Sequence, residues 1–256
     1  MALDDGRHYF EFLAKLGLTK HMGSMDATRR LVELCHIEGG EDVLDVGTGV
    51  GATPAYLVKA LGCHVFGVDL LEEMVQQARQ EIRAHQVGDR VALAAADARR
   101  LPFADGSFDT VIMESLNVFF DDKLQAMRGY VRVAKPGGHV GLTEMTWLSP
   151  PSPEKAAYYR RTVYADALQA EGWMELLEEA GLQDVVGYAQ PVEIAREGMG
   201  RLERYGCRGI VGVLLRTVRT VFKDRASRVF LKDVMQSLPQ DFVEDVGYGV
   251  YAGRKG

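Results

Sequence analysis

The chain has 256 residues, of which 47% are hydrophobic and 26% charged, the composition of an ordinary globular protein with a sizeable core. Its net charge of −6 argues against general affinity for nucleic acid, whose phosphates require a basic surface. No apolar run approaches the ~20 residues of a membrane-spanning helix. The three cysteines and six histidines are scattered without metal-ligand spacing. We therefore expect no metal, reduced thiols and a cytoplasmic location.

The N-terminal residues 1–39 predict a helical cap before the main domain. Apolar side chains recur at helical spacing over residues 5–20, and a second helix is expected to run to about His36 after a break at 20–24. Gly39 and Gly40 then form a turn that leads into the first predicted strand.

Residues 43–51 form an apolar, β-branched run that ends in three glycines spaced two apart. Glycine permits positive φ and close approach of a ligand to the backbone. Pro54 suits the first turn of the helix that follows, and a helix start offers free N–H groups and partial positive charge. The pattern predicts a nucleotide-type site at the carboxyl end of a strand. Because Gly47, Gly49 and Ala52 also satisfy the dinucleotide fingerprint, more than one cofactor class stays open.

Strands and helices alternate through five rounds, which predicts an α/β fold with a doubly wound, mainly parallel sheet. The strands are expected at 43–46, 64–69, 91–96, 109–114 and 139–144. Asp69 ends the second strand, 18 residues after Gly51. A carboxylate there can accept hydrogen bonds from both hydroxyls of a ribose, and it can also cap the next helix.

Asp45 lies two residues before the first glycine and completes an Asp-x-Gly-x-Gly-x-Gly pattern, which resembles motif I of the class I S-adenosylmethionine (SAM) dependent methyltransferases. Asp69, Asp97 and the Lys-Pro-Gly-Gly turn at 135–138 extend this resemblance over roughly 40–190, closest to small-molecule enzymes of the quinone-biosynthesis type. The resemblance implies a seven-stranded Rossmann-like methyltransferase fold, with an antiparallel edge formed by strands at 185–189 and 248–252, and SAM as cofactor. The cofactor-binding residues that it implies are Asp45, Gly47, Thr48, Gly49, Gly51, Asp69, Leu70, Asp97, Ala98 and Glu114.

Methyl transfer from the sulfonium of SAM is an in-line displacement, which needs positioning and exclusion of water more than a covalent nucleophile. A base helps where the acceptor must lose a proton. The catalytic candidates are acids after strands four and five and a histidine in the cap: Glu114, Glu144 and His21. The candidates for a substrate pocket are aromatic: Trp147, Tyr158, Tyr159 and Tyr164. Each group also has a plainer interpretation, as a helix cap, a surface histidine or a core aromatic residue.

We expect one methyltransferase domain over 1–256, with the cap at 1–39, the SAM-binding core at 40–190, a helical insert at 191–240 and the last strand in 241–256. The insert has ten basic and five acidic residues, which leaves −11 on the rest of the chain. Its apolar stripes follow helical spacing, so we expect a helical subdomain that packs on the sheet or covers the site. A basic surface for weak contact with anionic membranes, or a homodimer interface, is the alternative.

The expected function is SAM-dependent methyl transfer to a small, partly apolar molecule. Nucleic acid is not expected as substrate, because Glu114-Ser-Leu-Asn117 lacks the Asp/Asn-Pro-Pro-aromatic motif of the amino-methylating DNA enzymes. One alternative is a nicotinamide-dependent oxidoreductase, in which Asp69 would bind ribose equally well, although no Tyr-x-x-x-Lys pair follows from Tyr158 or Tyr159. Another is a SAM-binding protein without catalysis.

Overall fold

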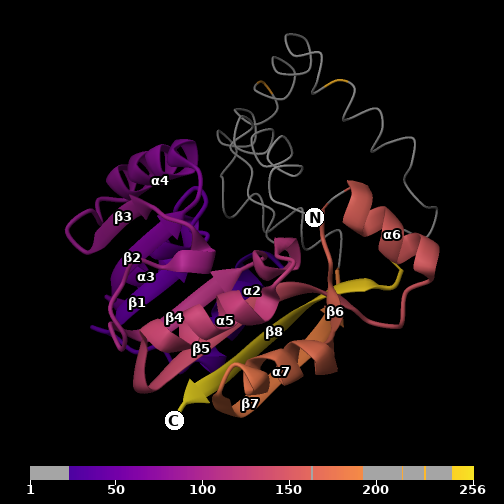
Figure 1. The fold of residues 1–256 in the computed structure, drawn as a ribbon. Helices are drawn as coiled ribbons and strands as arrows, with labels where there is room; N and C mark the ends of the chain where they lie inside the picture. Colours follow the sequence, from indigo (N-terminus) through magenta and orange to yellow (C-terminus); the bar gives the residue numbers. More distant parts are fainter. Residues whose placement is uncertain (1–22, 163, 193–214, 216–227, 229–243) are drawn as a thin grey trace.

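A mixed β-sheet organises the computed structural model, which describes residues 23–162, 164–192, 215, 228 and 244–256 (Figure 1). The strands follow the order β3-β2-β1-β4-β5-β8-β7, and a short β6 pairs with β5 outside this path. Their bounds are β1 Asp42–Val46, β2 His64–Asp69, β3 Val91–Ala95, β4 Phe108–Glu114, β5 Ala134–Trp147, β6 Leu168–Gln169, β7 Leu182–Pro191 and β8 Val246–Lys255.

The pairing confirms the predicted doubly wound topology. Strands β1 to β5 pair in parallel, and β8 runs antiparallel to both β5 and β7. The predicted count of seven strands is wrong by one, because the sheet of the described residues has eight. The extra strand is β6, whose two residues pair with Thr146 and Trp147 and are too few to leave a period in the sequence.

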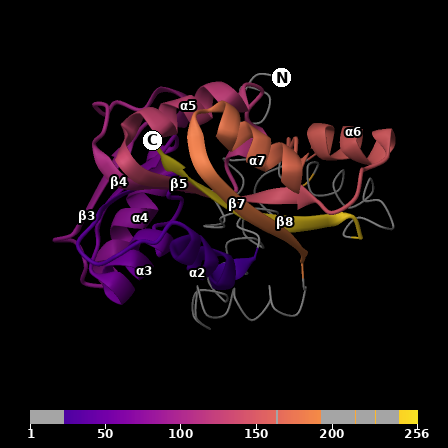
Figure 2. The same ribbon diagram turned by 90° about the horizontal axis from the view of Figure 1, so that it is seen from below.

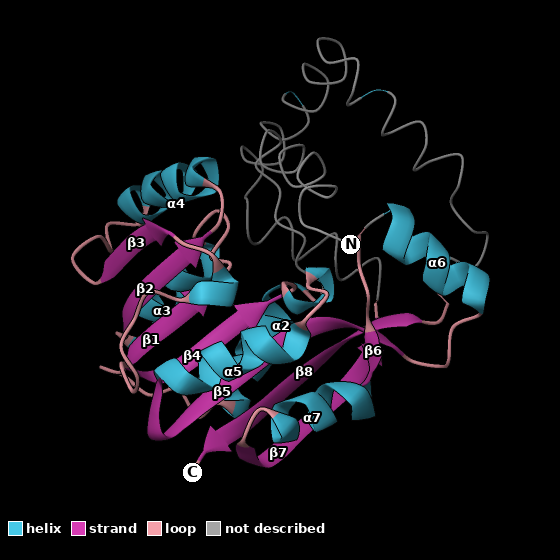
Figure 3. Cartoon of the chain, in the orientation of Figure 1, coloured by secondary structure: helices cyan, strands magenta, loops and turns pink. Residues whose placement is uncertain are grey.

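Helices cover both faces of the sheet (Figures 2 and 3). Their bounds are α2 Ser24–Leu34, α3 Ala52–Leu61, α4 Glu72–Ala84, α5 Lys123–Val133, α6 Pro153–Thr162 and α7 Ala170–Glu179, with short 3₁₀ turns η1 Ala98–Arg100 and η2 Asn117–Phe119. Helices α2 and α3 pack on one face, where they bury Leu31 and Leu57. Helices α5 and α7 pack on the other, where they bury Tyr130 and Trp173. Helix α6 lies beyond the end of β5 (Figure 2).

The two helical layers explain why successive apolar residues are buried in the central strands, as at Val43 and Leu44 of β1 and Val111 and Ile112 of β4. A parallel sheet that is covered on both faces has no solvated side, so its strands contain continuous apolar runs. The ends of the strands are therefore where polar side chains concentrate. Because β1, β2 and β4 are parallel, their carboxyl ends meet at one edge of the sheet, where Asp45, Asp69 and Glu114 lie.

Some predicted boundaries need correction. The turn predicted for 135–138 is part of β5, where the pairing with β4 shifts register between Phe108 and Thr110 and Gly137 has a φ of 79°. The last strand is longer than expected and begins at Val246. The first predicted helix, and most of the insert predicted for 191–240, lie outside the described residues. Among the helices that the structure describes, none is long and apolar enough to span a bilayer.

Candidate active site

The glycine turn between β1 and α3 packs tightly against α4 and β2. The φ angles of Gly47, Gly49 and Gly51 are all positive, at 80°, 53° and 85°. A Cβ on Gly51 would lie 3.0 Å from Cα of Ala78 in α4, so a larger residue would clash with backbone. The N–H of Gly47 donates to the carbonyl of Val68, 2.8 Å away. The turn is therefore a fixed platform that requires glycine at its close approaches.

Asp45 braces the turn from inside. Its side chain is buried, and its Oδ2 accepts a hydrogen bond of 2.7 Å from the buried hydroxyl of Thr48. A buried carboxylate needs such partners, because desolvation disfavours its charged form. The structure thus joins two of the predicted cofactor-binding residues in one contact.

Asp69, at the end of β2, joins that strand to the same turn. Its Oδ2 accepts the N–H of Gly49 at 2.9 Å, and its Oδ1 accepts the N–H of Leu71 at 3.0 Å, just before α4. Burial raises the pKa of Asp69, and these N–H donors partly oppose the rise. Leu70 beside it is 50% exposed. Asp69 therefore accepts an N–H at the start of α4, as the plainer interpretation expects. It also lies beside the glycine turn.

Asp97 follows β3 and begins η1. Its carboxylate accepts the backbone N–H of Arg99 at 2.9 Å and two side-chain hydrogen bonds from the Arg99 guanidinium, the shorter at 2.7 Å. The hydrogen bond from Arg99 holds the pKa of Asp97 below its usual range. Contact of Asp97 and Ala98 with adenine stays a prediction.

Glu114 ends β4 and connects three elements. Its Oε2 accepts a hydrogen bond of 3.1 Å from the Thr28 hydroxyl of α2, and its Oε1 accepts one of 3.2 Å from the Thr53 hydroxyl of α3. The two threonines were not predicted from the sequence, because single hydroxyl residues in helices carry no signal for a partner 86 or 61 positions away. Their hydroxyls fix the carboxylate of Glu114 beside the helix that starts at the glycine turn.

The other catalytic candidates are placed differently. Glu144 has no exposed surface, and its carboxylate lies beneath the loop after β4, where it accepts the N–H of Leu116 at 2.9 Å. This position argues against direct contact with a substrate. His21 lies outside the described residues.

The predicted substrate aromatics are mainly core residues. Trp147, Tyr158 and Tyr159 are 6%, 5% and 3% exposed, and their rings form edge-to-face pairs with centroids 4.9 and 5.8 Å apart. Such packing accounts for them as the interface between α6 and the end of β5. Tyr164 is half-buried and has a φ of 54°. A substrate contact of any of the four stays a prediction.

Comparison with known proteins places this geometry in a class. Residues 43–138 match the family model described as "Methyltransferase domain". An uncharacterized protein of Haemophilus influenzae is 27% identical over 90% of this chain and 92% of its own length. The 27-O-demethylrifamycin SV methyltransferase of Amycolatopsis mediterranei is 32% identical over 64% of each chain.

A solved structure shares the fold. Phosphoethanolamine N-methyltransferase 2 of Haemonchus contortus, in complex with S-adenosyl-L-methionine, superposes with a TM-score of 0.68 at 23% identity, over 90% of this chain and 52% of its own. The chain spans less than two thirds of the length of the curated methyltransferases that it matches, for example 42% and 64%.

The fold is the Rossmann-like fold of the SAM-dependent methyltransferases, and residues 43–138 match their domain model. SAM is the cofactor of this class, as predicted, and these matches give no support to a nicotinamide-dependent oxidoreductase.

Proposed function

We propose that this chain binds SAM at the carboxyl edge of its sheet and transfers the methyl group to a small, partly apolar organic molecule. The observation that carries the proposal is the pair of acids on either side of the glycine turn. Asp45 accepts a hydrogen bond from the Thr48 hydroxyl and Asp69 accepts one from the Gly49 N–H, so both acids are fixed to the same short turn.

Asp69 has the capacity that ribose recognition requires. A carboxylate has about four acceptor positions, and the N–H groups of Gly49 and Leu71 occupy one on each oxygen. We propose that the remaining acceptor capacity of the carboxylate serves the ribose hydroxyls. The N–H groups fix the carboxylate before the ligand arrives, which lowers the entropy cost of binding.

The remaining roles follow the edge of the sheet. We propose that Asp97 and Ala98 lie beside adenine and that Asp45, Glu114 and the glycine turn surround the methionine part. In this proposal Glu114 is a binding residue held by Thr28 and Thr53 rather than a base. SAM supplies an activated methyl group, so these residues need only hold the donor in line with the acceptor and exclude water.

The proposed acceptor class rests on sequence and on relatives. By their names, the similar proteins include methyltransferases of phosphoethanolamine and of 27-O-demethylrifamycin SV, which are small molecules. The resemblance to the quinone-biosynthesis type favours a partly apolar acceptor. The acidic chain disfavours nucleic acid.

Cofactor binding is the first test. Thermal denaturation is followed with SAM, with S-adenosylhomocysteine (SAH) and with NAD, because a ligand that binds only the folded state raises the melting temperature. We expect a rise with SAM and SAH and none with NAD. A rise with NAD alone would contradict the proposal.

The acceptor is then sought with SAM labelled in its methyl group, incubated with an extract of the source cells and divided between organic and aqueous phases. Label in the organic phase supports a partly apolar acceptor, and label in the aqueous phase replaces it with a polar metabolite. Confirmed SAM binding without labelled product would favour a SAM-binding protein that does not transfer methyl groups.

A further inference from the structure

A buried carboxylate supports the loop between β4 and η2. Oε1 of Glu144 accepts three hydrogen bonds from that loop: 2.9 Å from the N–H of Leu116, 2.5 Å from the N–H of Asn117 and 3.1 Å from the side-chain amide of Asn117. One oxygen atom on β5 therefore fixes two successive residues of the loop.

The same loop borders the cofactor site. A Cβ on Gly47 would lie 3.2 Å from Cδ2 of Leu116, so the Leu116 side chain packs directly over the first glycine of the turn. Ser115 has a φ of 56°, a left-handed conformation that costs a non-glycine residue about 1 kcal/mol or more. The loop is thus strained at Ser115 and needs an anchor in order to stay in place.

Burying the Glu144 carboxyl group costs stability. Its Oε2 has no hydrogen-bond partner among the described residues, and the same is true of Oδ1 of Asn117 and the hydroxyl of Tyr130, all of them buried. Burial raises the pKa of Glu144 to about 7, although the N–H donors of Asn117 and Leu116 oppose the rise. A buried ionisable group with incomplete hydrogen bonding costs stability. Buried ionisable groups with a shifted pKa concentrate at functional sites, where holding a neighbouring group in place offsets the loss of stability.

We infer that Glu144 is a positioning residue for methyl transfer, which keeps Leu116 against Gly47 and Glu114 beside Thr28 and Thr53 without touching cofactor or substrate. This role rests on the proposed function. It replaces the expectation that Glu144 is itself catalytic.

Two substitutions separate positioning from catalysis. Glu144→Gln keeps an oxygen that accepts the N–H groups of Leu116 and Asn117, whereas Glu144→Ala leaves both N–H groups buried without an acceptor. The probe is SAH, titrated by calorimetry well below the melting temperature of each variant. We expect Glu144→Ala to bind SAH at least tenfold more weakly than the natural chain, and Glu144→Gln to stay within threefold.

A matched control comes from the opposite edge of the sheet. Glu41 is also a partly buried carboxylate whose pKa burial raises, and it accepts the Thr110 hydroxyl at 3.0 Å. Glu41→Ala is expected to lower the melting temperature with SAH affinity unchanged. A purely structural role for Glu144 would give the same result, so unchanged affinity in Glu144→Ala would overturn the inference. Equal weakening in Glu144→Gln and Glu144→Ala would also overturn it, because the charge rather than the acceptor would then be needed.

Hydrogen exchange in peptides that cover 113–120 gives an independent measurement. Protection of the Leu116 and Asn117 amides should persist in Glu144→Gln and be lost in Glu144→Ala. If Glu144→Ala does not fold, Asn117→Ala removes one of the three donors, and we expect it to weaken SAH binding at least threefold; unchanged binding would contradict the role. If the natural chain itself fails to bind SAH, the proposed function fails and the positioning role falls with it, whereas a failure of the role alone leaves SAH binding intact.

Discussion

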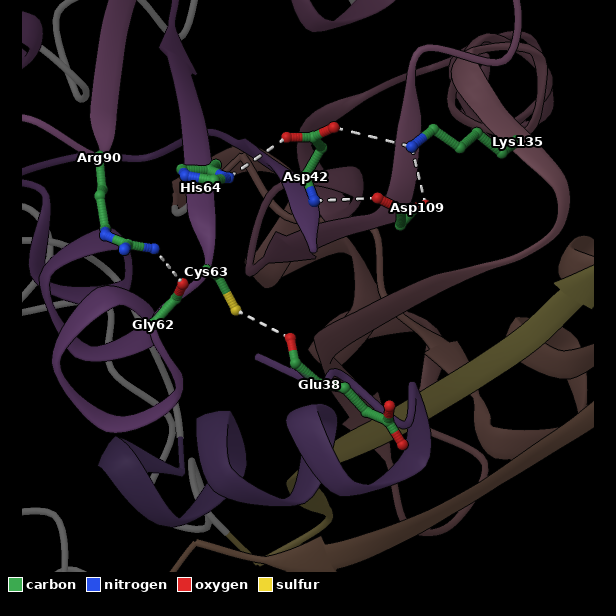
Figure 4. Close-up of polar contacts among 8 residues, drawn as sticks. All are labelled: Glu38, Asp42, Gly62, Cys63, His64, Arg90, Asp109 and Lys135. Atoms are coloured by element: carbon green, nitrogen blue, oxygen red, sulfur yellow. Dashed lines mark hydrogen bonds and ion pairs between the residues drawn. The ribbon is translucent and has the colours of Figure 1, made fainter. Parts of the chain in front are cut away.

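Two acids at the carboxyl edge of the sheet are held differently from two acids at its amino edge, whereas Asp97, also at the carboxyl edge, pairs with Arg99. At the carboxyl edge, Asp69 and Glu144 accept hydrogen bonds from backbone N–H groups, and burial raises the pKa of both. At the amino edge, Asp42 lies between His64 and Lys135, and Lys135 also contacts Asp109 at 2.8 Å (Figure 4). There burial alone would raise the pKa of Asp109, but the hydrogen bonds from Lys135 and from the backbone of Asp42 outweigh it and lower the pKa.

The difference separates stability from function. Asp42 and Asp109 are paired with a nearby lysine, and such exposed pairs contribute modestly to the stability of the fold. Asp69, which is held by neutral N–H donors, keeps acceptor capacity for a ligand with hydroxyl groups. The edge with neutral donors is also the edge where open parallel sheets bind ligands. We therefore propose that the carboxyl edge binds the cofactor and that the acids of the amino edge support the fold.

The largest expected effect concerns the pH dependence of stability at Glu144. Its pKa rises from an ordinary value of 4.5 to about 7 on folding, so its contribution is fully present below pH 4.5 and is lost as pH rises through 7. The change corresponds to about 3 kcal/mol at most. The nearby phenols of Tyr130 and Tyr251 do not titrate in this range, because burial raises the pKa of each further.

Urea unfolding of the natural chain and of Glu144→Gln at pH 5 and pH 8 measures this effect. The free energy of unfolding of the natural chain should fall between these pH values relative to that of the variant, which cannot ionise. Parallel changes in the two proteins would show that the carboxyl group does not titrate with a raised pKa.

A matched pair of acids sharpens the comparison between the edges. Asp69→Ala removes the proposed ribose acceptor and should weaken SAM binding by about 1–3 kcal/mol, the usual cost of losing a hydrogen bond to a charged group. Asp109→Ala removes an acid of the same type from the other edge and should lower the melting temperature with SAM affinity unchanged. Calorimetry with SAM compares the two, and equal loss of affinity in both variants would remove the functional distinction between the edges.

Local patterns predict one part of this site and not the other. The glycine turn, Asp45 and Asp69 were predictable because strand, turn and helix start lie within a few positions of one another. The contact of Glu114 with Thr28 was not, because it joins residues 86 positions apart through packing of α2 on the sheet. Glu144 lies between these cases: it follows Leu142 by two positions in a predicted strand, so alternation places both side chains on the same face of the sheet. Only the structure shows that the loop after β4 supplies its donors.

The smallest expected effect comes from Lys135, whose ammonium group lies 2.8 Å from Asp109 and 3.7 Å from Asp42. The lysine is 37% exposed, so solvent and salt screen both pairs. Lys135→Met should lower the free energy of unfolding by about 0.2–1 kcal/mol at low ionic strength, and 1 M salt should remove most of the difference.

SAM affinity is measured in the same Lys135→Met variant, and we expect it to be unchanged. The reason is geometric, because Lys135 lies at the start of β5 and Glu144 near its end, so the pairs of the amino edge are separated from the site by the length of the strand. A rigid core transmits a change over that distance only if the strand itself shifts. Weaker SAM binding in Lys135→Met, together with lost amide protection at Leu116, would therefore mean that β5 moves as one body and that its two edges are coupled.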